Sequence, residues 1–156
     1  MSNETLEKQN RPPQNRNFAF ILYPEDPRHE WTLQHVLRFP KLYKGVYILH
    51  DKDVWGQDDL EEYREKHDGQ DPNWQIGEPK KAHYHVLISW PSATTASSVA
   101  KRLGLNHVEA VSDKFAYTLY MLHEGYEWSD KYQYPFEALQ GDSATISKLT
   151  SKTQIL

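Results

Sequence analysis

The sequence predicts an α+β domain in which helices pack on one face of an antiparallel β-sheet. Three observations support this: β-branched apolar runs typical of strands, apolar residues at helical spacing, and alternation of the two along the chain. The expected order is strand, helix, strand, a long insert, then strand, helix, strand and helix. Two such strand–helix–strand passes favour a sheet of ferredoxin or RRM type, whose second face stays open for a site.

The first half of this order is marked by two apolar runs and two prolines. Residues 18–23 are an unbroken apolar run that a proline follows, which predicts a buried strand. Residues 30–39 place two leucines at helical spacing and also precede a proline, so we expect a helix that ends there. Residues 46–50 are the second predicted strand.

A long acidic insert separates the two halves. Residues 54–79 show no sustained period and contain three glycines and two prolines, although a short helix at 59–66 is expected. Loops of this length are often functional. The third strand is predicted at residues 82–90.

The second half predicts two helices around a short strand. One helix begins at a threonine cap, at position 94 or 95, and stops at Gly104. Residues 106–111 are predicted as the fourth strand. The last helix is expected from residue 112 or 113 through His123.

We expect one folded domain at residues 17–136 of the 156-residue chain, between a disordered arm (1–16) and a tail or linker (137–156). The arm is polar and has no signal-peptide core, and no apolar run approaches the length of a membrane span. The expectation is therefore a soluble intracellular protein with no membrane partner.

Composition limits the chemistry that is available. The chain has no cysteine and eight histidines, so only His, Asp and Glu can bind a metal, and these suit Mg, Mn or Zn. A net charge of −4 argues by itself against nucleic-acid binding. However, residues 51–78 hold ten of the 22 carboxylates and three of the 18 Lys and Arg, so the rest of the chain is net basic.

Two histidine motifs lie at the ends of neighbouring predicted strands. His83 and His85 are two residues apart in a strand, so they project from one face. His50 ends the previous strand and Asp53 follows in a turn. Each motif alone is more often an ordinary surface pair or turn. If the strands pair, however, the four side chains can converge on one site for a divalent ion such as Mg²⁺, Mn²⁺ or Zn²⁺.

The last helix carries two candidate nucleophiles. Tyr120 leaves the main apolar stripe of the helix, which suggests that its hydroxyl faces something other than the core. A phenol beside a divalent metal can attack a phosphodiester. Tyr117 lies about one turn earlier, and the residues alone leave both tyrosines open.

With these groups in this order, the chain resembles the HUH endonucleases, most of all the catalytic domain of RepB-type initiators of rolling-circle plasmid replication in Gram-positive bacteria. The matching segments lie within residues 18–135 and read FAFILYPEDP, ILHDKD, KKAHYHVLISW, YTLYMLHEG and KYQYP.

The resemblance implies a function and a site. His83 and His85 match the paired metal ligands, His50 and Asp53 match the additional ligands, and Tyr120 matches the nucleophile. Such enzymes nick one strand of single-stranded or hairpin origin DNA, keep the 5′ phosphate on tyrosine, free a 3′ hydroxyl as primer, and later rejoin the strand. Initiators of this type often carry a further oligomerisation domain, so a homo-oligomer is among the expected assemblies.

Candidate DNA contacts and two other functions stay open. Four basic residues are available for DNA phosphates or are solvated surface charges: Lys80, Lys81, Lys101 and Arg102. The chain could instead be an HUH transposase or conjugative relaxase, which share the histidine pair and the tyrosine. A third alternative is a non-catalytic, RRM-like module that binds single strands, which would leave the His and Asp grouping unexplained.

Overall fold

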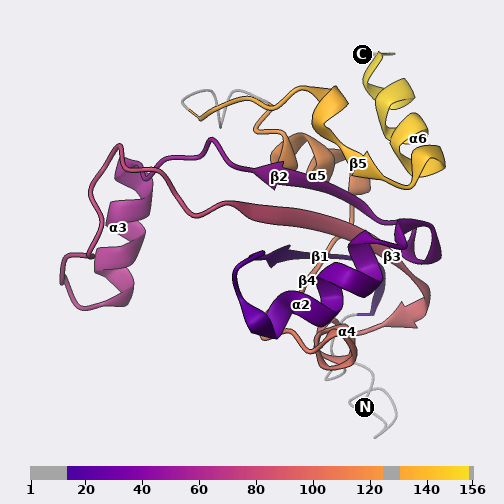
Figure 1. Ribbon diagram of the computed structural model, residues 1–156, viewed down its shortest axis with the longest axis horizontal. Helices are drawn as coiled ribbons and strands as arrows, with labels where there is room; N and C mark the ends of the chain where they lie inside the picture. The colour runs from indigo at the N-terminus through magenta and orange to yellow at the C-terminus, as the bar shows by residue number, and fades with distance from the viewer. Residues whose placement is uncertain (1–13, 125–130, 155–156) are drawn as a thin grey trace, which may run out of the picture.

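The computed structural model describes residues 14–124 and 131–154 (Figure 1). Its sheet is antiparallel throughout and has the strand order β4-β1-β3-β2-β5. The first four strands therefore follow the ferredoxin-like order, and the predicted α+β class is confirmed. The strands are β1 (Asn15–Leu22), β2 (Val46–His50), β3 (His83–Thr94), β4 (Glu109–Ala110) and β5 (Gln140–Gly141).

The helices in the described residues are α2 (Glu30–Thr32), α3 (Gln57–Lys66), α4 (Ala96–Leu103), α5 (Lys114–Met121) and α6 (Ser143–Gln154). The predicted helix at 30–39 is composite, because α2 continues into a π-helical segment, η2 (Leu33–Leu37). Short 3-10 segments are η1 (Pro27–His29), η3 (Pro40–Tyr43) and η5 (Phe136–Ala138). None of the helices in this part of the chain is both long and apolar enough to cross a bilayer.

One face of the sheet carries the first hydrophobic core. Alternation along β1 and β3 points Phe18, Phe20, Val86 and Ile88 to this side, where η2 and α4 cover them. Thr95 caps α4, and Gly104 ends it with a positive φ of 68°, as its sequence predicts.

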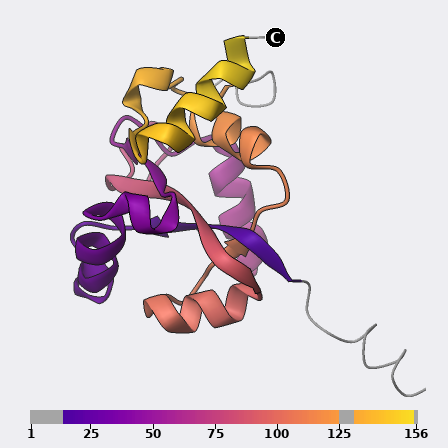
Figure 2. The same cartoon turned by 90° about the vertical axis from the view of Figure 1, so that its right-hand side faces the viewer.

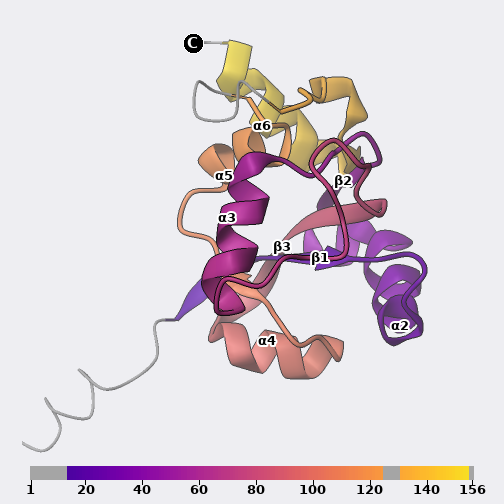
Figure 3. The same cartoon turned by 90° about the vertical axis from the view of Figure 1, so that its left-hand side faces the viewer.

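The opposite face carries a second core, so the prediction of helices on one face only is wrong. Val46, Ile48 and Leu87 pack there against Met121 of α5 and Leu149 of α6. Figures 2 and 3 show α5 and α6 on one side of the sheet and α2 and α4 on the other. The side left open in the prediction is thus partly covered by helices.

Strand register places three histidines on this second face. In the β2–β3 pair His50 lies opposite His83 and Ile48 lies opposite His85. Because side chains alternate, the three histidines project to the same side as Ile48. They lie at the end of the sheet where β2 finishes and β3 begins.

The predicted boundaries of the folded region need correction. β1 already begins at Asn15, inside the predicted arm, whereas residues 1–13 lie outside the described part. The predicted tail contains β5 and α6, and Leu139 and Leu149 are each 6% exposed within the second core. The predicted strand at 106–111 shortens to two residues, since Val108 packs into the first core instead.

The acidic insert forms a separate projection. α3 contains the predicted short helix, has no buried residue and stands away from the sheet (Figure 1). A bridge between Val54 and Pro79 ties the two ends of the insert together. The backbone N–H of Trp55 also donates to Glu78 at 2.9 Å, so the insert leaves and rejoins the sheet at one point.

We predict that Leu149→Ala destabilises the whole domain by about 2–4 kcal/mol, because it removes a buried side chain from the second core. Urea unfolding measures this change, and Ser147→Ala on the exposed side of α6 serves as the matched control. Equal stability of the two variants would mean that α6 does not contribute to the core.

Candidate metal centre

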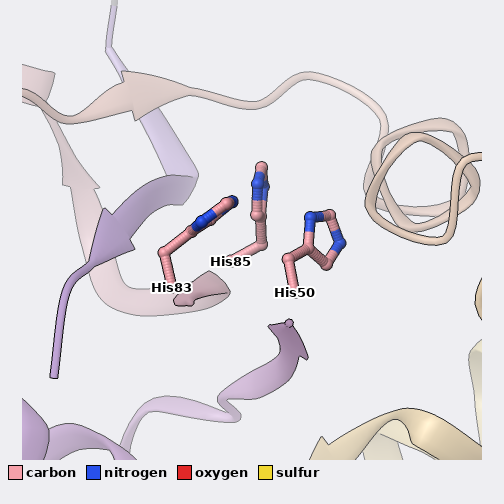
Figure 4. A group of neighbouring side chains, drawn as sticks. All are labelled: His50, His83 and His85. Carbon is pink, nitrogen blue, oxygen red and sulfur yellow. The ribbon is translucent and has the colours of Figure 1, made fainter. Parts of the chain in front are cut away.

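Three imidazoles meet where β2 ends and β3 begins (Figure 4). One nitrogen from each of His50, His83 and His85 lies within 4.8 Å of the others, and the residues are 1%, 6% and 6% exposed. The ring centroids of His50 and His85 are 4.1 Å apart. The structure thus brings the three predicted histidine ligands together.

Asp53 joins the group through the turn after β2. Its Oδ2 lies 3.0 Å from His50 Nδ1 and 3.8 Å from His83 Nε2. A second set of ligand atoms within 4.8 Å of one another comes from His50, Asp53 and His123. The two sets share His50, so the structure does not bring the four predicted ligands together as one tight set.

His50 is held between two acceptors. Its Nε2 lies 2.6 Å from the carbonyl oxygen of Met121, which can only accept, so Nε2 carries the hydrogen. In the neutral ring Nδ1 then holds a lone pair, yet this atom faces the carboxylate of Asp53. A cation, either a proton or a metal ion, is needed between these two groups.

His85 offers the clearest sign of a missing partner. Its Nδ1 is buried and has no hydrogen-bond partner in the structure, which is costly for a polar atom unless something else binds there. Burial, reinforced by His50 and His83, lowers the pKa of His85 to about 2, so the imidazole is neutral near pH 7. A neutral imidazole has one nitrogen with a lone pair, which is what a divalent ion requires.

His83 and Asp53 are also prepared as ligands. The Nδ1–H of His83 donates to the carbonyl of Lys81 at 2.8 Å, which leaves Nε2 with the lone pair toward Asp53. Burial by itself raises the pKa of Asp53, but the contact with His50 and the hydrogen bond from Tyr134 outweigh it and hold this pKa well below its usual range. The carboxyl is therefore ionised, and the donor set fits a hard or borderline divalent ion.

Sequence reasoning did not identify two residues of this centre as parts of the ligand group. Tyr134 is buried, stacks on His50 at 4.5 Å and donates its hydroxyl to Asp53 Oδ1 at 2.7 Å. His123, which the sequence marks only as the end of the last predicted helix, has its Nδ1 2.8 Å from the carbonyl oxygen of Tyr132 and 3.9 Å from Asp53 Oδ1. The feature of the sequence that could have identified His123 is its position three residues after Tyr120.

The two tyrosines of α5 differ in their surroundings. The ring of Tyr120 lies 6.1 Å from that of His85, and both residues line a pocket of about 300 Å³ that Tyr117 also lines. Tyr117 is 5.3 Å from Tyr120 and packs against the second core. Burial, with Glu109 the next contributor, raises the pKa of Tyr120. Position thus favours Tyr120 for chemistry at this centre.

The basic residues expected at DNA divide into two groups. Lys80 pairs with Asp59 at 3.1 Å and lies 4.8 Å from the centre of the Trp55 ring. Lys81 is exposed beside His83. Lys101 and Arg102 are exposed on α4, the helix that covers the face opposite the histidines.

An aromatic pocket adjoins the histidines. It encloses about 720 Å³, and its lining includes His83, Tyr23, Trp55 and Trp74 together with Lys80. The two tryptophans stack at 4.1 Å with an interplanar angle of 5°. The acidic insert therefore supplies aromatic surface next to the candidate metal ligands.

Comparison with known proteins shows a similarity to a replication protein. No protein-family model matches the chain. Over 120 residues it is 32% identical to "Replication protein RepB" of Streptococcus agalactiae, an alignment that covers 70% of this chain and 46% of the relative. The chain thus spans about half the length of the curated relative it matches. This similarity supports the assignment of the chain as a RepB-type replication initiator.

We predict that the metal-free protein loses stability as the pH falls below 6.5. Burial lowers the pKa values of His83, His85 and His123, so below 6.5 the unfolded chain takes up protons that the folded chain does not. His85 alone contributes a loss of about 1.4 kcal/mol between pH 7.5 and 5.5. Urea unfolding in chelator at pH 7.5, 6.5 and 5.5 measures the effect. His85→Gln should show a shallower decline, and an unchanged slope in that variant would contradict the prediction.

Proposed function

We propose that the protein is a plasmid replication initiator that nicks one strand of origin DNA in the bacterial cytoplasm and later rejoins it. The observation that carries the proposal is the meeting of three buried imidazoles and an ionised carboxylate beside the ring of Tyr120. Similarity to a RepB replication protein supports the same function independently of the geometry.

In this proposal His50, His83 and His85 would hold one divalent ion, Mn²⁺ or Mg²⁺, with Asp53 as the carboxylate ligand. Such an ion supplies Lewis-acid polarisation of a phosphoryl oxygen. Tyr134 positions the Asp53 carboxylate through its 2.7 Å hydrogen bond, and the Met121 carbonyl fixes the ring of His50.

Tyr120 is the proposed nucleophile. Its hydroxyl oxygen forms a bond to phosphorus, and the bond between phosphorus and the 3′ oxygen breaks. The downstream strand stays on tyrosine through its 5′ phosphate, and the upstream strand leaves as a 3′ hydroxyl after taking up a proton. Because burial raises the pKa of Tyr120, its phenol enters the reaction protonated and must release that proton during the attack. Rejoining is the reverse transfer to a 3′ hydroxyl.

The proposed substrate is single-stranded or hairpin DNA. The aromatic pocket beside His83 offers the ring surface of Tyr23, and unpaired bases stack on such surfaces. Lys80 and Lys81 line the same pocket and supply positive charge for the backbone. Lys101 and Arg102 lie across the sheet, so the proposal gives them no part at the metal centre.

The alternatives are weaker but distinguishable. An HUH transposase or conjugative relaxase would use the same histidines and tyrosine, but the similarity to a replication protein favours initiation. A non-catalytic single-strand-binding module would not explain why the Nδ1 of His85 is buried without a hydrogen-bond partner. A homo-oligomeric assembly stays a prediction.

We predict a covalent adduct between the protein and DNA. The probe is a pool of single-stranded oligonucleotides with a random centre and a labelled 3′ end, mixed with protein and Mn²⁺ or Mg²⁺. Because the downstream strand stays on the protein, the label should migrate with it in denaturing gels. Tyr120→Phe should reduce the adduct about 100-fold or more, because it removes the attacking oxygen.

Tyr117→Phe is the matched control and should leave the adduct near its wild-type level. Chelator should abolish the adduct, and His85→Gln should reduce it strongly. An adduct that survives in Tyr120→Phe and disappears in Tyr117→Phe would move the nucleophile to the other tyrosine. The absence of any adduct with either metal would count against nicking.

A further inference from the structure

A further cavity, with a concentration of positive charge, lies away from the candidate metal centre. It encloses about 550 Å³ between the start of α5, the side of α6 and the far part of β3. Its lining contains four lysines, which together we call the lysine pocket: Lys44, Lys114, Lys148 and Lys152. The chain as a whole has a net charge of −4, so this cluster does not follow from the overall composition.

Lys114 is the innermost of the four. It is half-buried, and its Nζ donates to Ser89 Oγ at 3.0 Å, while that hydroxyl donates to Asn17 Oδ1 at 2.9 Å. Burial, with Lys44 and Lys148 adding to it, lowers the pKa of Lys114. This effect of Lys44 and Lys148 is electrostatic repulsion between ammonium groups, and a bound anion would reduce that repulsion.

The other three lysines line the same cavity as Lys114. Lys148 and Lys152 are one turn apart on α6, and Lys152 lies 5.1 Å from the centre of the Phe115 ring. Lys44 is exposed at a left-handed position with φ of 48°. None of the four forms an ion pair with a carboxylate of residues 14–124 or 131–154.

Two carboxylates offset part of this charge. Asp113 lines the pocket and caps α5 by accepting from the backbone N–H of Ala116 at 3.0 Å. Asp142 accepts from the hydroxyl of Thr145 at 2.6 Å, and its charge favours the protonated form of Lys114. Four lysines against these two carboxylates leave the pocket net positive.

The pocket is connected to the metal centre by one helix. α5 begins at Lys114 in the pocket and carries Tyr120 beside His85 in its last turn. Along β3, Ser89 of the pocket is four residues from His85, about 13 Å. That separation corresponds to about four base pairs of duplex.

We propose that the lysine pocket binds the phosphodiester backbone of DNA at a point several nucleotides from the phosphate at the metal centre. The inference rests on the proposed function, because it takes the ligand of the pocket to be a further stretch of the same DNA. Lysines suit this ligand as point charges for phosphate. The pocket orients bound DNA without any base-specific contact, so its contribution is independent of sequence.

The test is the salt dependence of DNA binding in chelator, where no nicking occurs. A 20-base-pair duplex and a 20-nucleotide single strand are the two probes. Each lysine that contacts a phosphate contributes about 0.9 to the slope of log affinity against log salt for duplex, and about 0.7 for a single strand. Lys148→Gln/Lys152→Gln, both on the exposed side of α6, should therefore lower the slope by about 1.8 or 1.4.

Lys101→Gln/Arg102→Gln is the matched control, since it removes the same charge from an exposed helix on the other face. Lys114→Met tests the innermost lysine separately, and a thermal melt confirms that it folds. A slope that falls for either probe supports the pocket, and the probe affected identifies duplex or single-stranded DNA. Equal slopes in the α6 variant and wild type, or an equal fall in the α4 control, would overturn the inference.

The outcome is separable from that of the proposed function. A protein that forms the tyrosine adduct but keeps its salt slope in the lysine variants refutes the pocket alone. A protein that never forms the adduct, yet loses salt slope in these variants, retains the pocket and refutes nicking.

Discussion

The pairing of β2 with β3 is the constraint on which the candidate site depends. It sets His50 opposite His83, and the alternation of side chains then brings His85 to the same face. A shift of one residue would turn one strand's histidines toward the other face of the sheet. The apolar residues Ile48 and Leu87 specify the register, because they must enter the second core at the same time.

This arrangement is costly in the absence of a cation. The Nδ1 of His85 is buried without a partner, and both nitrogens of His50 face acceptors. Two well-packed cores hold the strands in place on either side, so the fold can maintain a local cluster that is unfavourable by itself. Unsatisfied groups of this kind are most readily explained by a ligand that binds all of them.

Local patterns were enough to predict β2, the α4 caps and the histidine pair. They did not predict the elements and side chains whose positions depend on contacts between distant parts of the chain. α6 has few apolar residues among many Ser, Thr and Lys, yet Leu149 completes the second core. Tyr134 reaches Asp53 across 81 positions of sequence, and no short-range pattern encodes that contact. Leu139 likewise joins the core from a segment whose composition resembles a linker.

α5 links the candidate metal centre to the lysine pocket. The helix joins a concentration of lysines at its start to the tyrosine near its end, on the face that its partner α6 also covers. α6, which the sequence analysis does not predict, thus completes the surface on which the proposed DNA substrate would lie. The acidic insert, by contrast, contributes aromatic rings beside the histidines and projects from the rest of the fold.

Pulsed electron paramagnetic resonance of the protein with one equivalent of Mn²⁺ tests the central claim most directly, because it detects nitrogen atoms bound to the ion. The account predicts couplings from three histidine nitrogens in the wild-type protein and from two in His85→Gln. A Mn²⁺ signal without histidine couplings, or the same couplings in both proteins, would contradict the assignment of this cluster as a metal centre.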